Sequence, residues 1–130
     1  MVFPSFKATR PKRTSKQLGD AAEDAALLYL QQAGLRLLAR NYRTPGRGGG
    51  EIDLIMCDAA GVTVFVEVRQ RNARYPGAAA ASVNRAKQQR LVFAAGHYLA
   101  QFATPPPCRF DVLSVESGTI TWLQAAFDAQ

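Results

Sequence analysis

The sequence predicts an α/β fold in which a mixed β-sheet is flanked by helices, with the element order αβββαββ. Three observations support this class. The chain has 130 residues, 48% of them hydrophobic and 20% charged, which is typical of one domain with one core. Two segments have helical apolar spacing, and several shorter segments alternate apolar and polar side chains. Glycine and proline clusters separate these segments.

The first fourteen residues predict a flexible basic arm, so the single folded domain is expected to span residues 15–130. The arm contains two prolines, no acidic residue and four basic residues, Lys7, Arg10, Lys12 and Arg13. Ser15 is the expected cap of a first helix that runs to about Ala33, because its apolar stripe repeats at helical spacing and Gly34 ends it.

Three strands are expected after the first helix. Residues 35–42 mix apolar and basic side chains in a short strand-like run, and the glycine-rich segment 44–50 predicts a loop. Residues 51–58 and 62–71 alternate in polarity on either side of a three-residue connection, which is typical of a β-hairpin. A loop is expected at 72–81.

The C-terminal half predicts a second helix and a second hairpin. The helix is expected from Ser82 to about Phe102, because Thr104 and three prolines follow it. Its apolar stripe comprises Leu91, Ala94, Ala95, Tyr98 and Phe102. Strands at 108–115 and 119–125, joined around Ser117 and Gly118, complete the sheet.

The first hairpin carries acidic residues on one strand face, and its apolar residues predict its register. The expected register sets Ile52, Leu54 and Met56 against Val68, Val66 and Val64, all on one apolar face, and the alternative is a register slipped by two residues. On the other face, Asp53 is then expected directly opposite Glu67. The same register sets Glu51 opposite Arg69.

Two opposed carboxylates predict a metal site. Like charges in a cross-strand pair are destabilising, and a hard cation such as Mg²⁺ or Mn²⁺ relieves the repulsion by taking carboxylate oxygens as ligands. A metal at Asp53 and Glu67 beside Arg69 is the arrangement that phosphodiester hydrolysis requires. The alternative is a solvated sheet face on which Arg69 is only a salt-bridge partner.

Three more residues are candidates for the same site. Lys87 extends the apolar stripe of the second helix by one turn, so a helix packed over the strands would direct Lys87 and Gln88 at the carboxylates. In the alternative interpretation, Lys87 only lays its aliphatic stem along the helix. Glu23 falls at the border of the apolar arc of the first helix, which permits a site role without requiring one.

The charge pattern points to a phosphate backbone as the partner. Sixteen Lys and Arg residues against ten Asp and Glu give a net charge of +6. A basic band without carboxylates follows the acidic hairpin, and we expect its arginines to bind nucleic acid: Arg69, Arg71, Arg74, Arg85 and Arg90. DNA is the expected partner, with RNA as the alternative. Neither a monomer nor a homodimer is excluded.

Other classes of protein are disfavoured by the sequence. It has no apolar stretch long enough to span a membrane and no signal-peptide pattern, so a soluble, cytoplasmic protein without a membrane partner is expected. Cys57 and Cys108 form neither a CxxC motif nor a Cys/His cluster, which argues against a disulfide scaffold and a zinc module.

Four short motifs carry a family resemblance: residues 50–55 (GEIDLI), 64–69 (VFVEVR), 82–83 (SV) and 87–88 (KQ). With residues 40–43 (RNYR) and Gly19, Glu23 and Ala26, they make the chain resemble the YraN family of bacterial proteins over about residues 15–125. That family is similar to PD-(D/E)xK nucleases, including archaeal Holliday-junction resolvases, with a restriction-endonuclease-like core.

The resemblance implies a metal at Asp53 and Glu67, a contribution from Glu23 or Glu51, and support from Lys87 or Gln88. One position departs from the pattern, because the last residue of the ExK element is Arg69 and not lysine. Arginine cannot act as a titratable base, although it can hold a phosphate. Either Lys87 supplies the amine, or the protein binds nucleic acid and cleaves poorly or not at all.

Three functional hypotheses follow. The first is a metal-dependent endonuclease acting on structured or branched DNA. The second is a non-catalytic nucleic-acid-binding protein that retains the nuclease fold. The third and weakest is an adaptor whose basic arm contacts an acidic protein.

Overall fold

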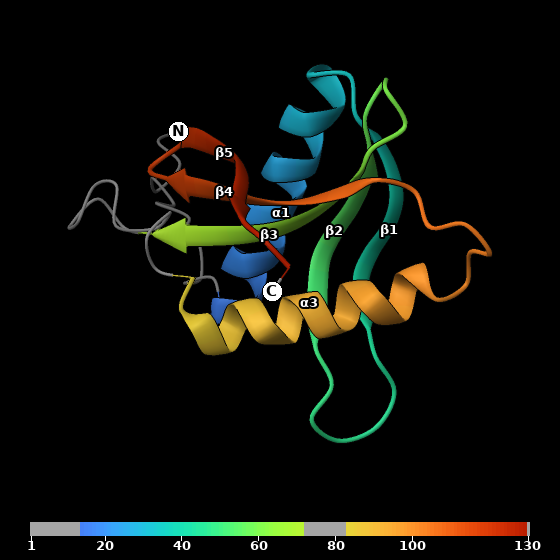
Figure 1. Ribbon diagram of the computed structural model, residues 1–130. Coiled ribbons are helices and arrows are strands. Elements are labelled where there is room, and N and C mark those ends of the chain that lie inside the picture. The colour runs from blue at the N-terminus through green and yellow to red at the C-terminus, as the bar shows by residue number, and fades with distance from the viewer. Residues whose placement is uncertain (1–13, 72–82, 130) are drawn as a thin grey trace, which may run out of the picture.

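The computed structural model describes residues 14–71 and 83–129 of the chain. Its elements are α1 (Ser15–Gln32), β1 (Arg36–Arg43), β2 (Glu51–Cys57), β3 (Thr63–Arg71), α3 (Arg85–Leu99), β4 (Cys108–Glu116) and β5 (Thr119–Phe127). The expected α/β class is confirmed, and the described elements follow the expected order (Figure 1). Residues 1–13 of the predicted arm and the predicted loop at 72–81 lie outside the described residues.

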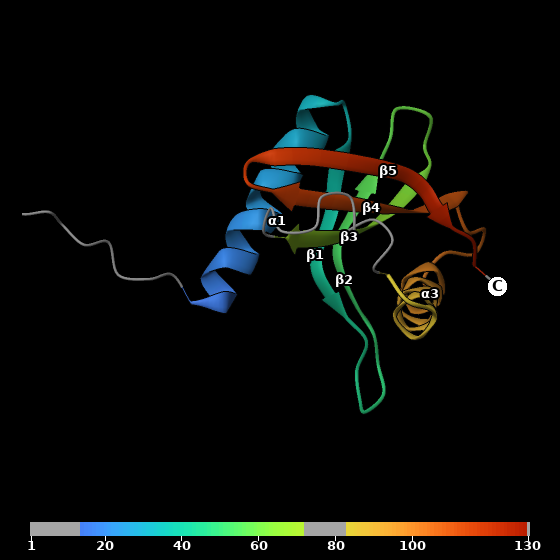
Figure 2. The same ribbon diagram turned by 90° about the vertical axis from the view of Figure 1, so that its left-hand side faces the viewer.

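The sheet has five strands in the order β1-β2-β3-β4-β5. Strands β3 and β4 pair in parallel, and every other neighbouring pair is antiparallel, so the sheet is mixed as expected. Helices α1 and α3 cover opposite faces of this sheet (Figure 2). The molecule therefore has three layers, with the sheet in the middle.

Each helix packs on its own apolar cluster. The α3 cluster contains Leu91, Ala94 and Ala95 of the predicted stripe, packed on Phe65 and Ile55 of the sheet. The α1 cluster joins helix and sheet residues on the other face, namely Ala26, Leu30, Leu35, Leu54, Met56, Val64, Val66 and Leu113. Burial of both sheet faces explains why the strands are rich in Val, Ile and Leu.

Both helices begin at a different residue from the one predicted. Thr14, and not Ser15, caps α1, because its hydroxyl accepts from the Gln17 N–H at 3.1 Å while the Gln17 side chain accepts from the Thr14 N–H. Helix α3 begins at Arg85, since the Asn84 side chain accepts from the Lys87 N–H at 2.8 Å.

Helix α3 also ends earlier than expected, at Leu99 and not at about Phe102. The Phe102 N–H donates to the Leu99 carbonyl, three residues back, so the helix closes in a tighter turn. The proline run begins only after this turn, so it does not itself end the helix.

The predicted hairpin register is confirmed in the half next to the β2–β3 turn, where Leu54 pairs with Val66 and Met56 with Val64. The prediction for the other half is wrong, because the ladder ends at Leu54 and Val66 and pairs neither Ile52 with Val68, nor Asp53 with Glu67, nor Glu51 with Arg69. Ile52 lies in the α3 cluster, on the opposite face from Leu54. The cause lies in the neighbouring strand β1, where Asn41 has a left-handed φ of 52° at the level of Asp53. Regular alternation breaks there on both strands.

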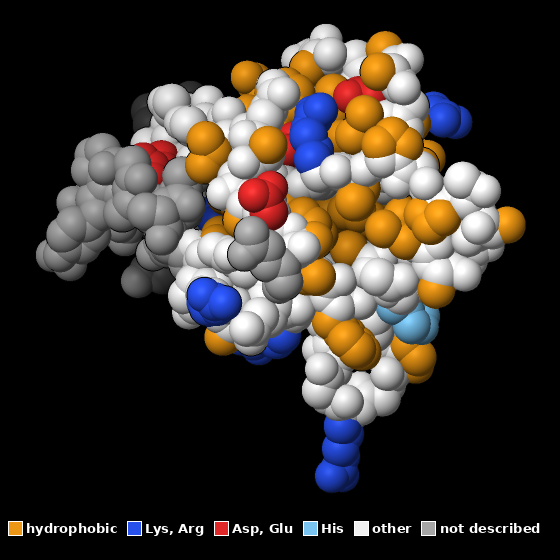
Figure 3. All heavy atoms as spheres, in the orientation of Figure 1, with side chains coloured by type: hydrophobic (Ala, Val, Ile, Leu, Met, Phe, Trp, Pro, Cys, Tyr) orange, Lys and Arg blue, Asp and Glu red, His pale blue; other side chains and the backbone are white. Residues whose placement is uncertain are grey.

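Gly50, at the end of the β1–β2 loop, packs directly on α3. A Cβ atom at this position would collide with the Arg90 carbonyl oxygen. The loop itself extends past α3 (Figure 1), and a basic side chain projects from its tip (Figure 3). Glycine at position 50 therefore allows the loop and the helix to touch.

We expect Gly50→Ala to lower the free energy of unfolding by about 2 kcal/mol, because the backbone of α3 must move to admit the methyl group. Urea denaturation followed by circular dichroism measures this change. Gly19→Ala is the matched control, since Gly19 lies within α1 and a methyl group there would have no atom within 4 Å. This control should be neutral or stabilising. Equal stability of Gly50→Ala and the parent would contradict the close contact.

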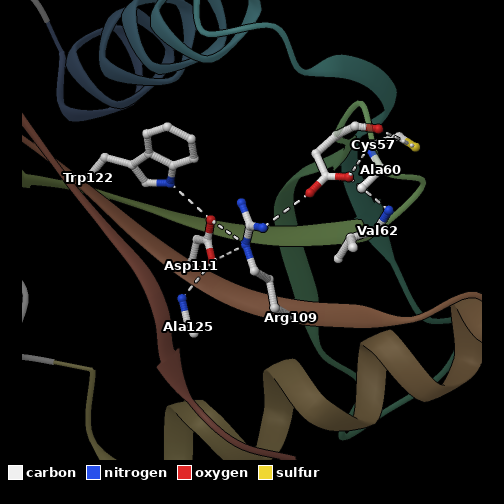
Figure 4. Close-up of polar contacts among 8 residues, drawn as sticks. Cys57, Ala60, Val62, Arg109, Asp111, Trp122 and Ala125 are labelled. Atoms are coloured by element: carbon white, nitrogen blue, oxygen red, sulfur yellow. Dashed lines mark hydrogen bonds and ion pairs between the residues drawn. The ribbon is translucent and has the colours of Figure 1, made fainter.

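A partly buried ionic network joins β4, β5 and the β2–β3 turn (Figure 4). Asp111 of β4 is fully buried and accepts from Arg109 Nε, from the Trp122 indole N–H at 2.9 Å and from the Ala125 N–H at 2.9 Å. Arg109 also contacts Asp58 Oδ2 at 3.2 Å. Ala125 has a left-handed φ of 50° at an irregularity in the β4–β5 ladder, so Asp111 holds this bulge in place.

Candidate metal and nucleic-acid site

Asp53 and Glu67 lie where β2 and β3 separate, and we call them the carboxylate pair. The last backbone pair of this ladder is Leu54 with Val66. Beyond it, Asp53 Oδ2 accepts a hydrogen bond of 2.8 Å from the Val68 N–H. A side-chain oxygen thus takes the place of a backbone acceptor, and it brings Asp53 beside Glu67.

Glu67 is the most buried carboxylate of the site, with 5% of its side chain exposed. Its Oε1 lies 3.3 Å from the ammonium of Lys87 and 4.0 Å from Arg69 Nε. Its Oε2 is buried without a hydrogen-bond partner among the described residues. Such an oxygen is costly to bury, and it is a ligand atom available to a cation.

The electrostatics of the pair disfavour two negative charges. Burial, and then the charge of Asp53, raise the pKa of Glu67 from 4.5 to about 7, although Lys87 acts in the opposite direction. Burial also raises the pKa of Asp53, against the opposing effect of the Val68 N–H. At neutral pH the pair therefore retains a proton for part of the time.

Two other acidic residues lie around the pair. Glu23 of α1 is 3.5 Å from Arg40 Nε, and its pKa is raised first by burial and then by the charge of Asp53. Glu51 is more exposed and lies 3.5 Å from Arg43. The charges of both predicted candidates, Glu23 and Glu51, therefore interact with the charge of Asp53. Each of the two also forms an ion pair with an arginine.

The donor set suits a hard cation held by few protein ligands. Within residues 14–71 and 83–129, no three His, Cys, Asp or Glu side chains form a group that could hold a metal. Two carboxylates are nevertheless sufficient for Mg²⁺, which keeps several waters and commonly binds one or two carboxylates together with substrate phosphate. The partnerless Oε2 of Glu67 fits this kind of site.

The remaining predicted residues are distributed differently. Gln88 donates to the Val83 carbonyl at 2.9 Å, and the described contacts do not bring its amide to the carboxylate pair. Arg85 lines a separate hollow with Gln88, and Arg90 is exposed on α3. Arg74 lies outside the described residues, and the side chain of Arg71 is outside them too.

Two hollows adjoin the site, and they share Arg43 and Glu51. One lies between the β1–β2 loop and α3 and also includes Lys87. The other, along α1 and β1, includes Glu23 and Arg40. Sequence reasoning does not predict Arg40 and Arg43 as site residues; the RNYR motif is the one available signal, and its geometry depends on the left-handed Asn41.

The described helices include none that is long and apolar enough to cross a membrane.

Comparisons with known proteins identify the family. The family model described as "Uncharacterised protein family UPF0102" matches residues 22–115. A UPF0102 protein of Albidiferax ferrireducens is 68% identical over 129 residues, covering 99% of each chain. One of Paracidovorax citrulli is 62% identical, covering 91% of this chain and 87% of its own. Another, of Cupriavidus necator, is 54% identical, covering 97% and 94%. The chain belongs to the UPF0102 family, which is the YraN family that its motifs resemble.

Proposed function

We propose that this protein is a metal-dependent endonuclease that cleaves phosphodiester bonds in structured or branched DNA. The observation that carries the proposal is the carboxylate pair: Glu67 is buried beside Asp53, with one oxygen that has no described partner. Because Oε1 of Glu67 already faces Lys87, Oε2 remains available as a ligand atom. A binding site for Mg²⁺ or Mn²⁺ accounts for it, with Asp53 and Glu67 as the ligands.

The neighbouring cations support a role in phosphoryl chemistry. A bound divalent metal would activate the attacking water and neutralise charge on the phosphate. Lys87 supports the negative charge of Glu67 from 3.3 Å, and among the described residues it is the lysine whose ammonium forms an ion pair with the carboxylate pair. Arg69 lies beside Glu67 and has the planar guanidinium that suits a phosphate oxygen. In this scheme, Lys87 supplies the amine that position 69 lacks.

One observation favours a second candidate, a nucleic-acid-binding protein that does not cleave. The third position of the Glu67-Val68-Arg69 element is arginine, and an arginine for lysine exchange is not neutral at a site that needs a titratable amine. Cleavage assays separate the two candidates. The endonuclease predicts Mg²⁺-dependent cutting of a branched DNA oligonucleotide that is lost in Glu67→Gln, whereas the alternative predicts binding without cutting.

Thermal denaturation with metal tests the pair directly. Adding millimolar Mg²⁺ or Mn²⁺ should raise the melting temperature of the parent, because a ligand that binds only the folded state stabilises it by mass action. Asp53→Asn should respond far less. Without metal, this variant should be as stable as the parent or more stable by about 0.2 to 1 kcal/mol, because it removes one of two opposed charges.

Asp128→Asn is the matched control, since Asp128 is exposed and lies near the C-terminus. It should keep the full metal response of the parent. If the parent shows no shift with metal, or if Asp53→Asn shifts as much as the parent, the carboxylate pair does not bind metal and the proposed endonuclease loses its physical basis.

A further inference from the structure

A basic hollow of about 380 Å³ lies beside the carboxylate pair, between the β1–β2 loop and α3. Its charged lining consists of Arg43, Lys87, Arg90 and Glu51, and backbone of the loop forms much of the rest. Three cations face one carboxylate, so the lining has a net positive charge. The hollow therefore has the electrostatics of an anion site.

The cations are not equally compensated. Arg43 lies 3.5 Å from Glu51, and Lys87 lies 3.3 Å from Glu67. Arg90 makes no ion pair with any residue in the described part of the chain. Its exposed guanidinium is thus the cation of this hollow whose charge an incoming anion would meet without competition.

The loop that forms the other wall is held in a defined shape. The Thr44 N–H donates to the Gly50 carbonyl at 3.1 Å, and the Gly50 N–H donates back to the buried Thr44 hydroxyl at 2.9 Å. Gly50 in turn touches the backbone of α3 at Arg90. The hollow is therefore built by contacts between its two walls, and it does not depend on one flexible side chain.

Lys87 connects this hollow with the carboxylate pair. It is part of the lining, and its ammonium also contacts Glu67. An anion in the hollow would consequently be a neighbour of any group bound at the pair. Arg47, in the same loop, is exposed, and a basic side chain extends from the loop tip into solvent (Figure 3).

We propose that this hollow binds a backbone phosphate of DNA adjacent to the one at the carboxylate pair, with Arg90 and Arg43 as its main contacts. The inference rests on the proposed function, because it places a second phosphate of the same substrate. The sequence alone predicts neither the loop nor Arg43 as a nucleic-acid contact. By holding this phosphate, the hollow selects which phosphodiester bond lies at the pair.

Binding of a short duplex DNA oligonucleotide to the full chain, followed by fluorescence anisotropy in EDTA, tests the hollow without metal or cleavage. Arg90→Gln and Arg43→Gln should each weaken binding about three- to tenfold and reduce the salt dependence by about one phosphate contact. Arg90→Lys should lose less, because it keeps the charge. Arg36→Gln is the matched control, an exposed arginine at the other end of β1 with no role in the hollow.

The outcomes separate this inference from the proposed function. If Arg90→Gln and Arg43→Gln bind DNA no worse than Arg36→Gln, the hollow is not a phosphate site, while the metal test of Asp53 keeps its meaning. If the parent does not cleave DNA but the two arginine variants bind it more weakly than the parent, the phosphate site is supported and the proposed endonuclease function is contradicted. If the parent binds no DNA at all, both are overturned. Circular dichroism of each variant confirms that it is folded.

Discussion

Replacing Asp111 by alanine should lower the free energy of unfolding by about 3 to 5 kcal/mol, because Arg109 would lose part of its charge compensation and two N–H donors would lose their acceptor. Arg109 would lose its bond to Asp111 and keep only Asp58, and the indole N–H of Trp122 would lose its acceptor. The β5 bulge would also lose the bond to the Ala125 N–H. Urea denaturation followed by circular dichroism measures the change.

Asp128→Ala is the control for this prediction, since Asp128 is an exposed carboxylate near the end of β5. It should change the stability by less than about 0.5 kcal/mol, as surface substitutions usually do. A second test uses fluorescence, because Trp122 is the only tryptophan in the chain. Loss of Asp111 should alter its emission even under native conditions. A variant with parental stability would mean that the network contributes little to the fold.

The Asp111 network also shows what kind of feature cannot be predicted from the sequence. Asp111 lies between apolar residues on a predicted strand. Trp122 and Ala125 donate to it from the next strand, and Arg109 links it to Asp58, which is far away in the sequence. No local periodicity indicates such a set. The hairpin register near the turn, in contrast, is predictable, because Leu54 and Val66 pair on one apolar face, and a shift by one residue would set Leu54 opposite the charged Glu67.

Predictions fail where backbone geometry departs from regular alternation. Ideal alternation along a strand places Ile52 with Leu54, and the left-handed Asn41 of the neighbouring strand removes that regularity. The observed cap of the first helix is Thr14, one residue before the predicted Ser15. Both residue types are good caps, and only the hydrogen bonds with Gln17 distinguish them. These are tertiary or single-bond details that composition does not encode.

The candidate site is predictable in part. The sequence predicts that Asp53 and Glu67 lie close together, although the bond from the Val68 N–H to Asp53, and not a backbone pair, brings them there. The helical stripe brings Lys87 to Glu67 as predicted. Arg43 escapes prediction, because its place beside the pair depends on how the β1–β2 loop folds back onto α3. Gln88 is a candidate only because of its position on the helix. Its side-chain amide donates to the Val83 carbonyl and does not contact the carboxylate pair in the described structure.

Glu67 should make the metal-free protein less stable as the pH rises from about 4.5 to above 7. Its pKa is about 7 in the folded protein, against an ordinary value of 4.5, so the folded state binds the proton more tightly than the unfolded chain. The stabilisation from this proton is complete below pH 4.5 and is lost as the pH passes through 7. The loss amounts to about 3 kcal/mol at most, at about 1.36 kcal/mol for each unit of pKa difference.

Glu67→Gln isolates this effect, because the amide has nearly the same shape and no titrating proton. Subtracting the unfolding free energies of parent and variant at each pH from about 5 to 8 cancels the other titrating groups. We expect the unfolding free energy of the variant, relative to that of the parent, to increase steadily over this range. At the alkaline end the variant should be the more stable of the two. Since only ionised carboxylates bind a metal, the thermal shift of the parent with Mg²⁺ should also increase through about pH 7. A constant difference across this range would show that Glu67 ionises in the folded protein as it does in water, and the buried, partnerless oxygen would then need another explanation.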